Sequence, residues 1–220
     1  MTIGLGRAPG APSLNRRYYP DARRYLRIKR VFDLFFCITI LIPVLIIAFL
    51  CAVAVRLDSP GPVLFSQLRA GKDGRLLRIY KFRTMVANAE ELKASLAHLN
   101  VLPPPDFKIP NDPRITRVGK FLRKTSLDEL PQFVNVIRGE MSLVGPRPCS
   151  ISVRSYDLWH CERLEVPPGI TGLWQLEGRH VSTFDERLRL DIKYIESMSL
   201  TTDIRLILRT LLVVFKGSGE

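Results

Sequence analysis

The sequence predicts a mainly helical α+β protein whose N-terminal part is a re-entrant membrane helix hairpin. Three observations lead to this class. The segment Leu34–Val55 carries no charged residue, and ~20 apolar residues are what a helix needs to cross a ~30 Å hydrocarbon core. Strand patterns follow in Val63–Leu68 and Leu76–Phe82, and apolar residues at helical spacing lie nearer the C-terminus. We therefore expect a membrane-associated helix joined to a small domain with a short β-hairpin and interfacial amphipathic helices.

The membrane segment is expected to break in its middle. Pro43 removes a backbone donor and disfavours helical geometry at Ile42. Both flanks of the segment are basic, so a spanning helix would export one cationic flank, whereas a helix that enters and returns on one face exports neither. The basic residues are Arg24, Arg27, Lys29 and Arg30 before the segment and Arg56 and Arg69 after it.

The region before the membrane segment is basic. Residues 1–20 are rich in Gly, Pro and Arg and lack the apolar core of a signal peptide, so we expect a flexible arm. The run 21–30 mixes basic and apolar residues, which favours a helix against anionic headgroups, with a solvated charged helix as the alternative. The expected division is therefore residues 1–20, the membrane-associated residues 21–56 and a domain over residues 57–220.

The composition calls for an anionic partner. The 220 residues suffice for one domain with a hydrophobic core, and 33 Lys and Arg against 21 Asp and Glu give a net charge of +12. Anionic lipid and phosphorylated small molecules fit this charge. Nucleic acid is not expected as a partner, because aromatic residues interleave with basic ones only around residues 16–19 and no zinc-finger, RRM or basic-zipper pattern is present.

Cysteine and histidine spacing indicates neither disulfides nor zinc. No CxxC pair and no HExxH sequence occurs, so we expect reduced thiols of a cytoplasm-facing protein and no zinc site. The residues concerned are Cys37, Cys51, Cys149 and Cys161, and His98, His160 and His180.

A turn and a hairpin should follow the membrane segment. The sequence Asp58-Ser-Pro-Gly-Pro62 is a turn signal that ends the apolar helix, and residues 70–74 connect the two predicted strands. The second strand ends in Lys81-Phe-Arg83, which would bring two cations toward the functional stretch described below. The alternative is that both cations face solvent.

Helices and loops are predicted for the remainder of the chain. Residues 86–99 have helical composition, and the prolines between residues 103 and 113 indicate a long loop that serves as a flap or partner contact. The apolar residues Phe133, Val134, Val136 and Ile137 should form the buried face of one helix, and Phe184, Leu188, Ile192 and Ile195 that of another. Residues 156–164 are a short helix candidate, and Asp203–Lys216 suits a helix lying in the membrane interface or, alternatively, a core helix.

The candidate functional residues cluster between positions 123 and 148. Asp128 and Glu129 are adjacent, with Arg123 before them and Arg147 after them. A carboxylate pair among cations suits a polyphosphate with a divalent metal, because a carboxylate can hold the ion or attack phosphorus while guanidinium groups take up phosphoryl charge. Arg147 is held between two prolines, Pro146 and Pro148. We interpret this cluster as a phosphoryl-transfer site.

A structural alternative exists for the same stretch. Ser126 and Glu129 have the spacing of a capping box, in which both side chains satisfy free amides at a helix start. Pro131 would lie unusually late in the first turn of an ordinary helix. The spacing alone leaves capping and catalysis both open.

Two long ungapped stretches resemble the bacterial sugar transferases, the monotopic polyprenyl-phosphate glycosyl-1-phosphate transferases. They are Asp112-Pro-Arg-Ile-Thr-Arg-Val-Gly-Lys-Phe-Leu-Arg-Lys-Thr-Ser-Leu-Asp-Glu-Leu-Pro-Gln132 and Met141-Ser-Leu-Val-Gly-Pro-Arg-Pro148. The resemblance continues in shorter motifs: Lys29–Asp33, Leu57–Pro62, Ile79–Met85, Pro168–Gln175 and Gly178–Arg179. The family usually carries a Ser-Pro pair at the helix break, whereas this chain has Ile42-Pro43.

The resemblance implies an enzyme and a role for each site residue. It implies transfer of a sugar-1-phosphate from a UDP-sugar to polyprenyl (undecaprenyl) phosphate with release of UMP, as the first membrane step of bacterial polysaccharide assembly. Asp128 would be the nucleophile that forms a covalent phosphosugar intermediate, and Glu129 the Mg²⁺ ligand. The implied substrate contacts are Lys81, Arg123, Arg147 and Arg179, with Pro146 and Pro148 near the nucleotide.

The resemblance also implies a location and leaves rivals to test. It places a monotopic protein in the bacterial inner membrane with its catalytic domain on the cytoplasmic face, and a homo-oligomer is a possible assembly. Neither the sugar nor the pathway follows from the residues. The rival interpretations are a non-catalytic basic scaffold at the membrane and a nucleic-acid-binding membrane protein.

Overall fold

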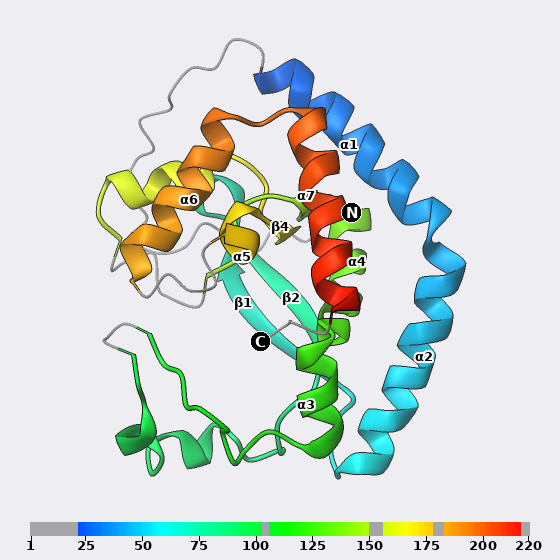
Figure 1. Ribbon diagram of the computed structural model, residues 1–220, viewed down its shortest axis with the longest axis vertical. Coiled ribbons are helices and arrows are strands. Elements are labelled where there is room, and N and C mark those ends of the chain that lie inside the picture. The colour runs from blue at the N-terminus through cyan, green and yellow to red at the C-terminus, as the bar shows by residue number, and fades with distance from the viewer. Residues whose placement is uncertain (1–21, 103–105, 150–155, 178–182, 217–220) are drawn as a thin grey trace.

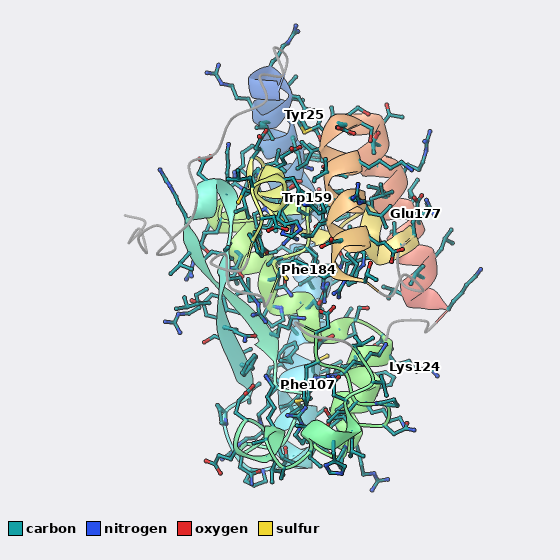
Figure 2. The ribbon with its side chains drawn as sticks, turned by 90° about the vertical axis from the view of Figure 1, so that its left-hand side faces the viewer. Tyr25, Phe107, Lys124, Trp159, Glu177 and Phe184 are labelled. Atoms are coloured by element: carbon teal, nitrogen blue, oxygen red, sulfur yellow. The ribbon has the colours of Figure 1, made fainter. Side chains whose placement is uncertain are left out.

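The computed structural model describes residues 22–102, 106–149, 156–177 and 183–216. Two helices in line, α1 (Ala22–Thr39) and α2 (Leu41–Asp58), form an arm that curves along one side of a compact α+β domain (Figure 1). A view turned by 90° places the hairpin of β1 (Leu64–Ala70) and β2 (Leu76–Phe82) on one side of the domain and α6 and α7 on the other (Figure 2). The predicted class, mainly helical α+β, is confirmed for these residues.

The arm bends between its two helices. Ile40 leaves the helical conformation, with φ −97° and ψ 5°, although its N–H still donates to the Phe36 carbonyl at 3.1 Å. Pro43 lies in the first turn of α2, where its ring has no N–H to give to the Thr39 carbonyl and would clash with that carbonyl in an unbroken helix. The prediction of a break at Ile42-Pro43 is therefore wrong in position, because the distortion falls one turn earlier. Figure 1 shows an open arc rather than two helices packed side by side.

The outer surface of the arm is apolar and exposed. α2 has a mean hydropathy of 2.4 with only 11% of its residues buried, and it is the one helix among the described residues that is long and apolar enough to cross a membrane. On α1, Val31, Phe35 and Ile38 are 68%, 70% and 69% exposed. Because a core helix of a soluble domain buries such residues, this surface needs a partner that is itself apolar.

The inner surface of α1 carries polar side chains that bind the domain, beside the apolar residues that pack on its core. Lys29 pairs with Asp203 at 2.6 Å, and Arg30 donates to the carbonyl oxygens of Val136 and of Ile137, the latter at 2.7 Å. The expectation that Lys29 and Arg30 belong to a basic flank facing headgroups is therefore wrong, since the domain uses both side chains. Arg24 and Arg27 remain exposed.

The predicted hairpin is confirmed. β1 and β2 pair antiparallel from Leu64 opposite Phe82 to Ala70 opposite Leu76. The connection is a tight 3-10 turn in which Asp73 and Gly74 have φ of 56° and 71°. β2 is the inner strand, since it buries three of its apolar side chains, those of Leu77, Ile79 and Phe82.

A second, parallel sheet was not predicted. β3 (Ser142–Val144) pairs with β4 (Gly169–Thr171), and both strands are too short to show a periodic pattern. The remaining helices are α3 (Arg117–Lys124), α4 (Phe133–Arg138), α5 (Leu173–Glu177), α6 (Phe184–Glu196) and α7 (Leu200–Phe215). Short 3-10 segments cover Lys72–Gly74, Glu91–Lys93, Ala97–Leu99, Leu127–Gln132 and Trp159–Leu164.

Two hydrophobic clusters join the arm to the domain. The larger contains Cys37 of α1 with residues of the two sheets, α4, α6 and α7. The smaller packs Cys51 and Val55 of α2 against Phe82 of β2 and Leu122 of α3. Leu127 and Leu130, in the segment between α3 and α4, pack on this second cluster. The C-terminal half of α2 therefore lies next to that segment.

Three predicted helices differ from the structure. Residues 86–99 form only turns and 3-10 segments, because almost every side chain there is exposed and a short helix without a docked face is marginal in water. Residues 156–164 contain a 3-10 segment in place of the helix. Of the apolar residues predicted to be buried in α4, only Val136 is fully buried, whereas Val134 and Ile137 are 43% and 44% exposed.

The last helix has one buried face, as the core-helix alternative requires, and the alternative of a helix in the membrane interface stays a prediction. Asp203 and Leu206 of α7 face the core and are buried. Four large apolar residues of the same helix are exposed: Ile204, Leu208, Leu211 and Leu212. α7 is therefore a core helix on one face and an apolar surface helix on the other. The helical spacing predicted for α6 is confirmed, with Leu188 and Ile195 buried.

Arg83 holds the turn after α2 instead of approaching the functional stretch. Its guanidinium donates to the carbonyl oxygens of Pro62 at 2.6 Å and Ser59 at 2.8 Å, and to the Ser59 hydroxyl at 2.7 Å. The prediction that two cations of β2 point toward the site is wrong for Arg83.

Replacing Arg83 should therefore destabilise the fold. Arg83→Met leaves two carbonyl oxygens without a donor and should lower the free energy of unfolding by roughly 1–3 kcal/mol. Arg78→Met is the matched control, because Arg78 is an exposed arginine of the same strand and its replacement should change stability little. Thermal unfolding in detergent measures both, and equal effects of the two substitutions would refute this role for Arg83.

Candidate active site

The two adjacent carboxylates lie on a tight segment between α3 and α4. Ser126 adopts a left-handed conformation with φ 56°, and the chain then forms the 3-10 segment Leu127–Gln132, here called the dyad segment. Pro131 lies within it, and regular α-helix resumes only at Phe133. Asp128 and Glu129 are 8% and 9% exposed. Buried neighbouring carboxylates are costly unless cations compensate them.

The capping alternative is wrong. The Ser126 side chain makes no cap hydrogen bond, and its backbone geometry is not that of an ordinary N-cap residue. The Glu129 carboxylate does not turn back to the start of the segment. It is bound by cations that come from two other parts of the fold.

Those cations are Lys81 and Arg147. Lys81 Nζ lies 2.6 Å from Glu129 Oε1 and 3.7 Å from Asp128 Oδ2, so this amine bridges both carboxylates. Arg147 binds Glu129 with two nitrogens, Nη2 at 2.7 Å from Oε1 and Nη1 at 3.4 Å from Oε2. The structure thus brings together four residues that are up to 66 positions apart in the chain.

The environment separates the acidities of the two carboxyl groups. Burial and the charge of Glu129 raise the pKa of Asp128 to about 6, against the opposing effect of Lys81, Arg147 and Arg123. Burial also acts to raise the pKa of Glu129, but Arg147 and Lys81 outweigh it through charge and hydrogen bonds and lower that pKa to about 2. Glu129 therefore stays ionised, and Asp128 is ionised at neutral pH but close to titration. Such a separation suits two carboxylates with different tasks.

Arg147 is fixed by its backbone. It follows β3 through Gly145, where a Cβ would lie 2.6 Å from the Pro167 carbonyl oxygen. The Arg147 carbonyl accepts a hydrogen bond from the Arg163 side chain, and the backbone N–H of Arg147 donates to the Asp191 carboxylate. Arg163 and Asp191 form a buried pair with contacts of 2.7 and 3.0 Å.

The guanidinium of Arg147 and its flanking prolines border an aromatic ring and a hollow. Arg147 lies over the Trp174 ring, 5.8 Å from its centre, and Arg187 lies 5.6 Å from the same centre. Pro146 and Pro148 line a hollow together with Gly71, Arg163 and Pro168, among others. Sequence reasoning missed Arg163, Asp191 and Trp174. Only Trp174 had a signal, since it lies in a motif of the family resemblance.

The other predicted site residues have mixed outcomes. Arg123 is near enough to lower the pKa of Asp128, and its Nε donates to the Thr84 hydroxyl at 2.9 Å. Arg179 lies outside the described residues. Ile42 and Pro43 lie in the arm and contribute no contact to the carboxylates.

The residues present fit Mg²⁺ only together with a phosphate ligand. Among the described residues, no three His, Cys, Asp or Glu side chains gather as a metal site. Mg²⁺ in phosphate-handling sites is commonly held by one or two carboxylates, with substrate oxygens and water completing its shell. Of the two Glu129 oxygens, Oε2 has the weaker contact with Arg147, at 3.4 Å against 2.7 Å for Oε1, so Oε2 has the greater capacity to accept a metal.

The fold and the site together place a buried carboxylate pair, compensated by two cations, beside an exposed apolar arm. The family model described as bacterial sugar transferase matches residues 24–217. The chain belongs to this family.

Relatives from several bacteria agree with this assignment. The chain is 46% identical over 197 residues to the galactosyl transferase CpsE of Streptococcus agalactiae, covering 89% of this chain and 44% of that protein. It is 42% identical over 201 residues to the undecaprenyl-phosphate galactose phosphotransferase of Salmonella typhimurium, covering 87% and 41%. The exopolysaccharide production protein ExoY of Sinorhizobium fredii is 36% identical over 197 residues, with 87% of each chain covered. The chain thus spans less than half the length of the first two relatives and most of the third.

The pKa of Asp128 is directly testable. With ¹³C-labelled aspartate, the carboxyl signal lost in Asp128→Asn should titrate with a midpoint of about 6. Lys81→Met should move this midpoint upward, because it removes the amine that bridges both carboxylates. A midpoint below 4, or no shift in Lys81→Met, would contradict the described electrostatics.

Proposed function

We propose that the protein transfers a sugar-1-phosphate from a UDP-sugar to undecaprenyl phosphate and releases UMP. The observation that carries the proposal is the buried Asp128–Glu129 pair compensated by Lys81 and Arg147. Family membership supports the reaction class. Two relatives are named for undecaprenyl-phosphate transfer, of galactose in Salmonella typhimurium and of glucose-1-phosphate from UDP-glucose in Escherichia coli, the latter 38% identical.

In the proposed first step, an Asp128 carboxylate oxygen attacks the sugar-bearing phosphorus of the UDP-sugar. The new bond joins this oxygen to phosphorus, the bond to the bridging oxygen breaks, and UMP leaves with that electron pair. In the second step a phosphate oxygen of the lipid attacks the same phosphorus, and Asp128 departs as a carboxylate. Covalent relay of this kind divides one crowded encounter between two substrates into two. A pKa of about 6 leaves Asp128 ionised at neutral pH, as a nucleophile requires.

The cations around the pair have a role in the same steps. Lys81 lies 3.7 Å from Asp128, and Arg147 is near enough to lower the pKa of that carboxyl, so both cations would neutralise charge that develops on a phosphoryl group attached to Asp128. Bound Mg²⁺ would neutralise the diphosphate and ease departure of UMP. Glu129, kept ionised by its two cations, is the residue that would hold this ion together with the substrate phosphates. Arg123 and Arg179 are the further phosphate contacts that we propose.

The arm supplies the location. We propose that α1 enters one leaflet of the bacterial inner membrane from the cytoplasmic face, that the chain turns back at the bend near Ile40, and that α2 returns to the same face. The exposed apolar faces of both helices would then contact lipid. Leu127 and Leu130 of the dyad segment pack on Cys51 and Val55 of α2. This packing puts Asp128 beside the end of α2, and insertion of the arm as proposed would bring the carboxylate to the depth of a lipid phosphate.

Asp128→Asn should abolish transfer while leaving the protein folded and membrane-bound, because an amide is not a competent nucleophile. UMP release is measured with a panel of UDP-sugars, polyprenyl phosphate and Mg²⁺, which also identifies the sugar. Asp73→Asn is the matched control, since Asp73 lies in the hairpin turn and its left-handed conformation suits asparagine. Undiminished UMP release by Asp128→Asn would refute the mechanism, and no UMP release by the wild type with any sugar would refute the function.

The topology makes a separate prediction. In a Cys149→Ser background, single cysteines at Arg24 and Lys72 should both react with an impermeant thiol reagent only from the cytoplasmic face. The other native cysteines are buried and should stay unlabelled. A cysteine at Phe35, on the apolar face of α1, should be protected from both sides. Labelling of positions 24 and 72 from opposite sides would show that the arm spans the membrane.

A further inference from the structure

β3 leads directly to Arg147, so whatever holds this strand also holds the arginine. All three residues of β3 are buried. On one edge the strand bonds to β4 and the residues before it, through Ser142 N–H to Pro168 O at 2.8 Å and Gly145 N–H to Thr171 O at 2.9 Å. The short parallel pairing by itself is a weak support for a catalytic arginine.

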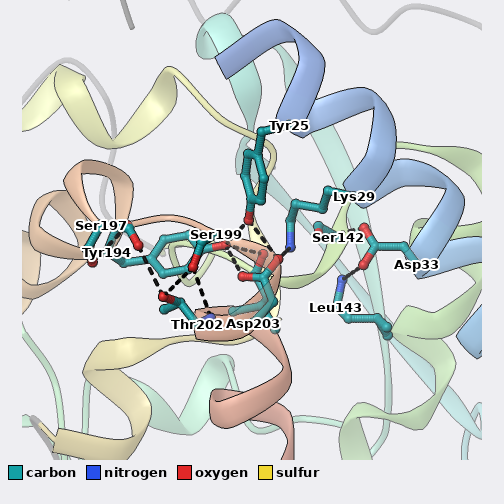
Figure 3. A network of polar contacts seen from close by, with 11 residues as sticks. Tyr25, Lys29, Asp33, Ser142, Leu143, Tyr194, Ser197, Ser199, Thr202 and Asp203 are labelled. Carbon is teal, nitrogen blue, oxygen red and sulfur yellow. Dashed lines mark hydrogen bonds and ion pairs between the residues drawn. The ribbon is translucent and has the colours of Figure 1, made fainter. Parts of the chain in front are cut away.

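A residue of the arm binds β3 as well. The Ser142 hydroxyl donates to Asp33 Oδ2 at 2.7 Å, and the Leu143 N–H lies 3.4 Å from Asp33 Oδ1, as Figure 3 shows. Asp33 and Ser142 are both only 2% exposed. A buried carboxylate is strongly destabilising without its donors, so the pairing of α1 with β3 is specific rather than incidental.

A second anchor sits one and two turns earlier on the same face of α1. Asp203 of α7, fully buried, accepts from Lys29 at 2.6 Å, from Tyr25 at 2.7 Å and from Tyr194 at 2.7 Å (Figure 3). The Tyr194 hydroxyl also lies 3.3 Å from the Val144 carbonyl. Since a hydroxyl has one proton, the shorter contact with Asp203 is the stronger bond. The arm thus contacts β3 directly and, through Asp203 and Tyr194, at its last residue.

The path from this anchor to the active site is short and stiff. Between Val144 and Arg147 stand only Gly145 and Pro146, and the proline ring fixes its own φ. The Gly145 backbone lies so close to the Pro167 backbone that a Cβ at Gly145 would be 2.6 Å from the Pro167 carbonyl oxygen. A shift of β3 would therefore move the Arg147 guanidinium relative to Glu129 instead of being absorbed on the way.

We propose that Asp33 is a positioning residue for Arg147, through which the membrane arm sets the place of the active-site arginine. The inference rests on the proposed transferase function. It assigns to the polar face of α1 a task beyond anchoring: the same helix that enters the lipid holds, by Asp33 and Ser142, the strand that carries the phosphate-binding guanidinium.

The test compares variants at this contact in the full-length protein in lipid nanodiscs. Asp33→Ala removes both acceptors and should lower kcat on the order of 10²-fold, the cost of misplacing an active-site group by ~1 Å. Asp33→Asn should stay within about threefold of wild type, because an amide can accept from Leu143 and donate to the Ser142 hydroxyl. Ser142→Ala, a smaller change, should lie between them. Thr210→Val is the matched control, since it breaks a 2.7 Å hydroxyl contact with Thr171 on β4.

Measuring kcat per mole of folded protein separates positioning from simple destabilisation. A displaced Arg147 should lower kcat of the folded Asp33→Ala and Ser142→Ala proteins, whereas a purely structural role would lower only the folded fraction. Asp33→Asn keeps both hydrogen-bonding positions and should restore kcat, and Thr210→Val should leave kcat unchanged.

The outcomes are distinguishable. Loss of activity only in proportion to the loss of folded protein would show that Asp33 is only structural. Wild-type kcat in Ser142→Ala and in folded Asp33→Ala would also overturn the inference. Failure of the proposed function has a different signature, namely a wild type that releases no UMP with any UDP-sugar. If Asp33→Ala does not fold, Ser142→Ala and Asp33→Asn decide the matter.

Discussion

The binding of Glu129 by Lys81 and Arg147 is the interaction on which the site depends. It joins the end of β2, the dyad segment and the loop after β3, three parts of the fold with no continuous secondary structure between them. A buried carboxylate without partners costs several kcal/mol, and these two cations remove that cost. They also keep Glu129 ionised next to a second carboxylate. The hairpin positions Lys81 and the small parallel sheet positions Arg147.

The same interaction gives the adjacent carboxylates different chemical characters. Glu129 takes the strong contacts and becomes a permanent anion, whereas Asp128 keeps one longer contact with Lys81 and a raised pKa. An anion with few hydrogen bonds is the better nucleophile, and a carboxylate that stays ionised and keeps one loosely bound oxygen can accept a metal. The arm adds location, because the dyad segment packs on α2 while α1 is bonded to β3. The packing of the apolar arm and the geometry of the active site are thus parts of one arrangement.

Much of this follows from local sequence, and the remainder depends on contacts between distant residues. Alternation predicted the hairpin, and the motif around Asp128 predicted the carboxylate pair. Lys81 near the end of β2 and Arg83 just after it are two positions apart, so spacing cannot tell which cation meets Glu129 and which is bound by the turn at Ser59. Strands of three residues such as β3 give no periodic signal. Lys29 looks like a headgroup contact until its partner, 174 positions away, is known.

The central claim is that Asp128 carries the sugar phosphate between the two substrates. Intact-protein mass spectrometry of enzyme mixed with the UDP-sugar donor and Mg²⁺, without lipid, tests it most directly. The account predicts added mass equal to one sugar phosphate, mapped by peptide analysis to Asp128, lost on addition of polyprenyl phosphate and absent from Asp128→Asn. An active enzyme that never shows this adduct, and releases UMP only when lipid is present, would contradict the account.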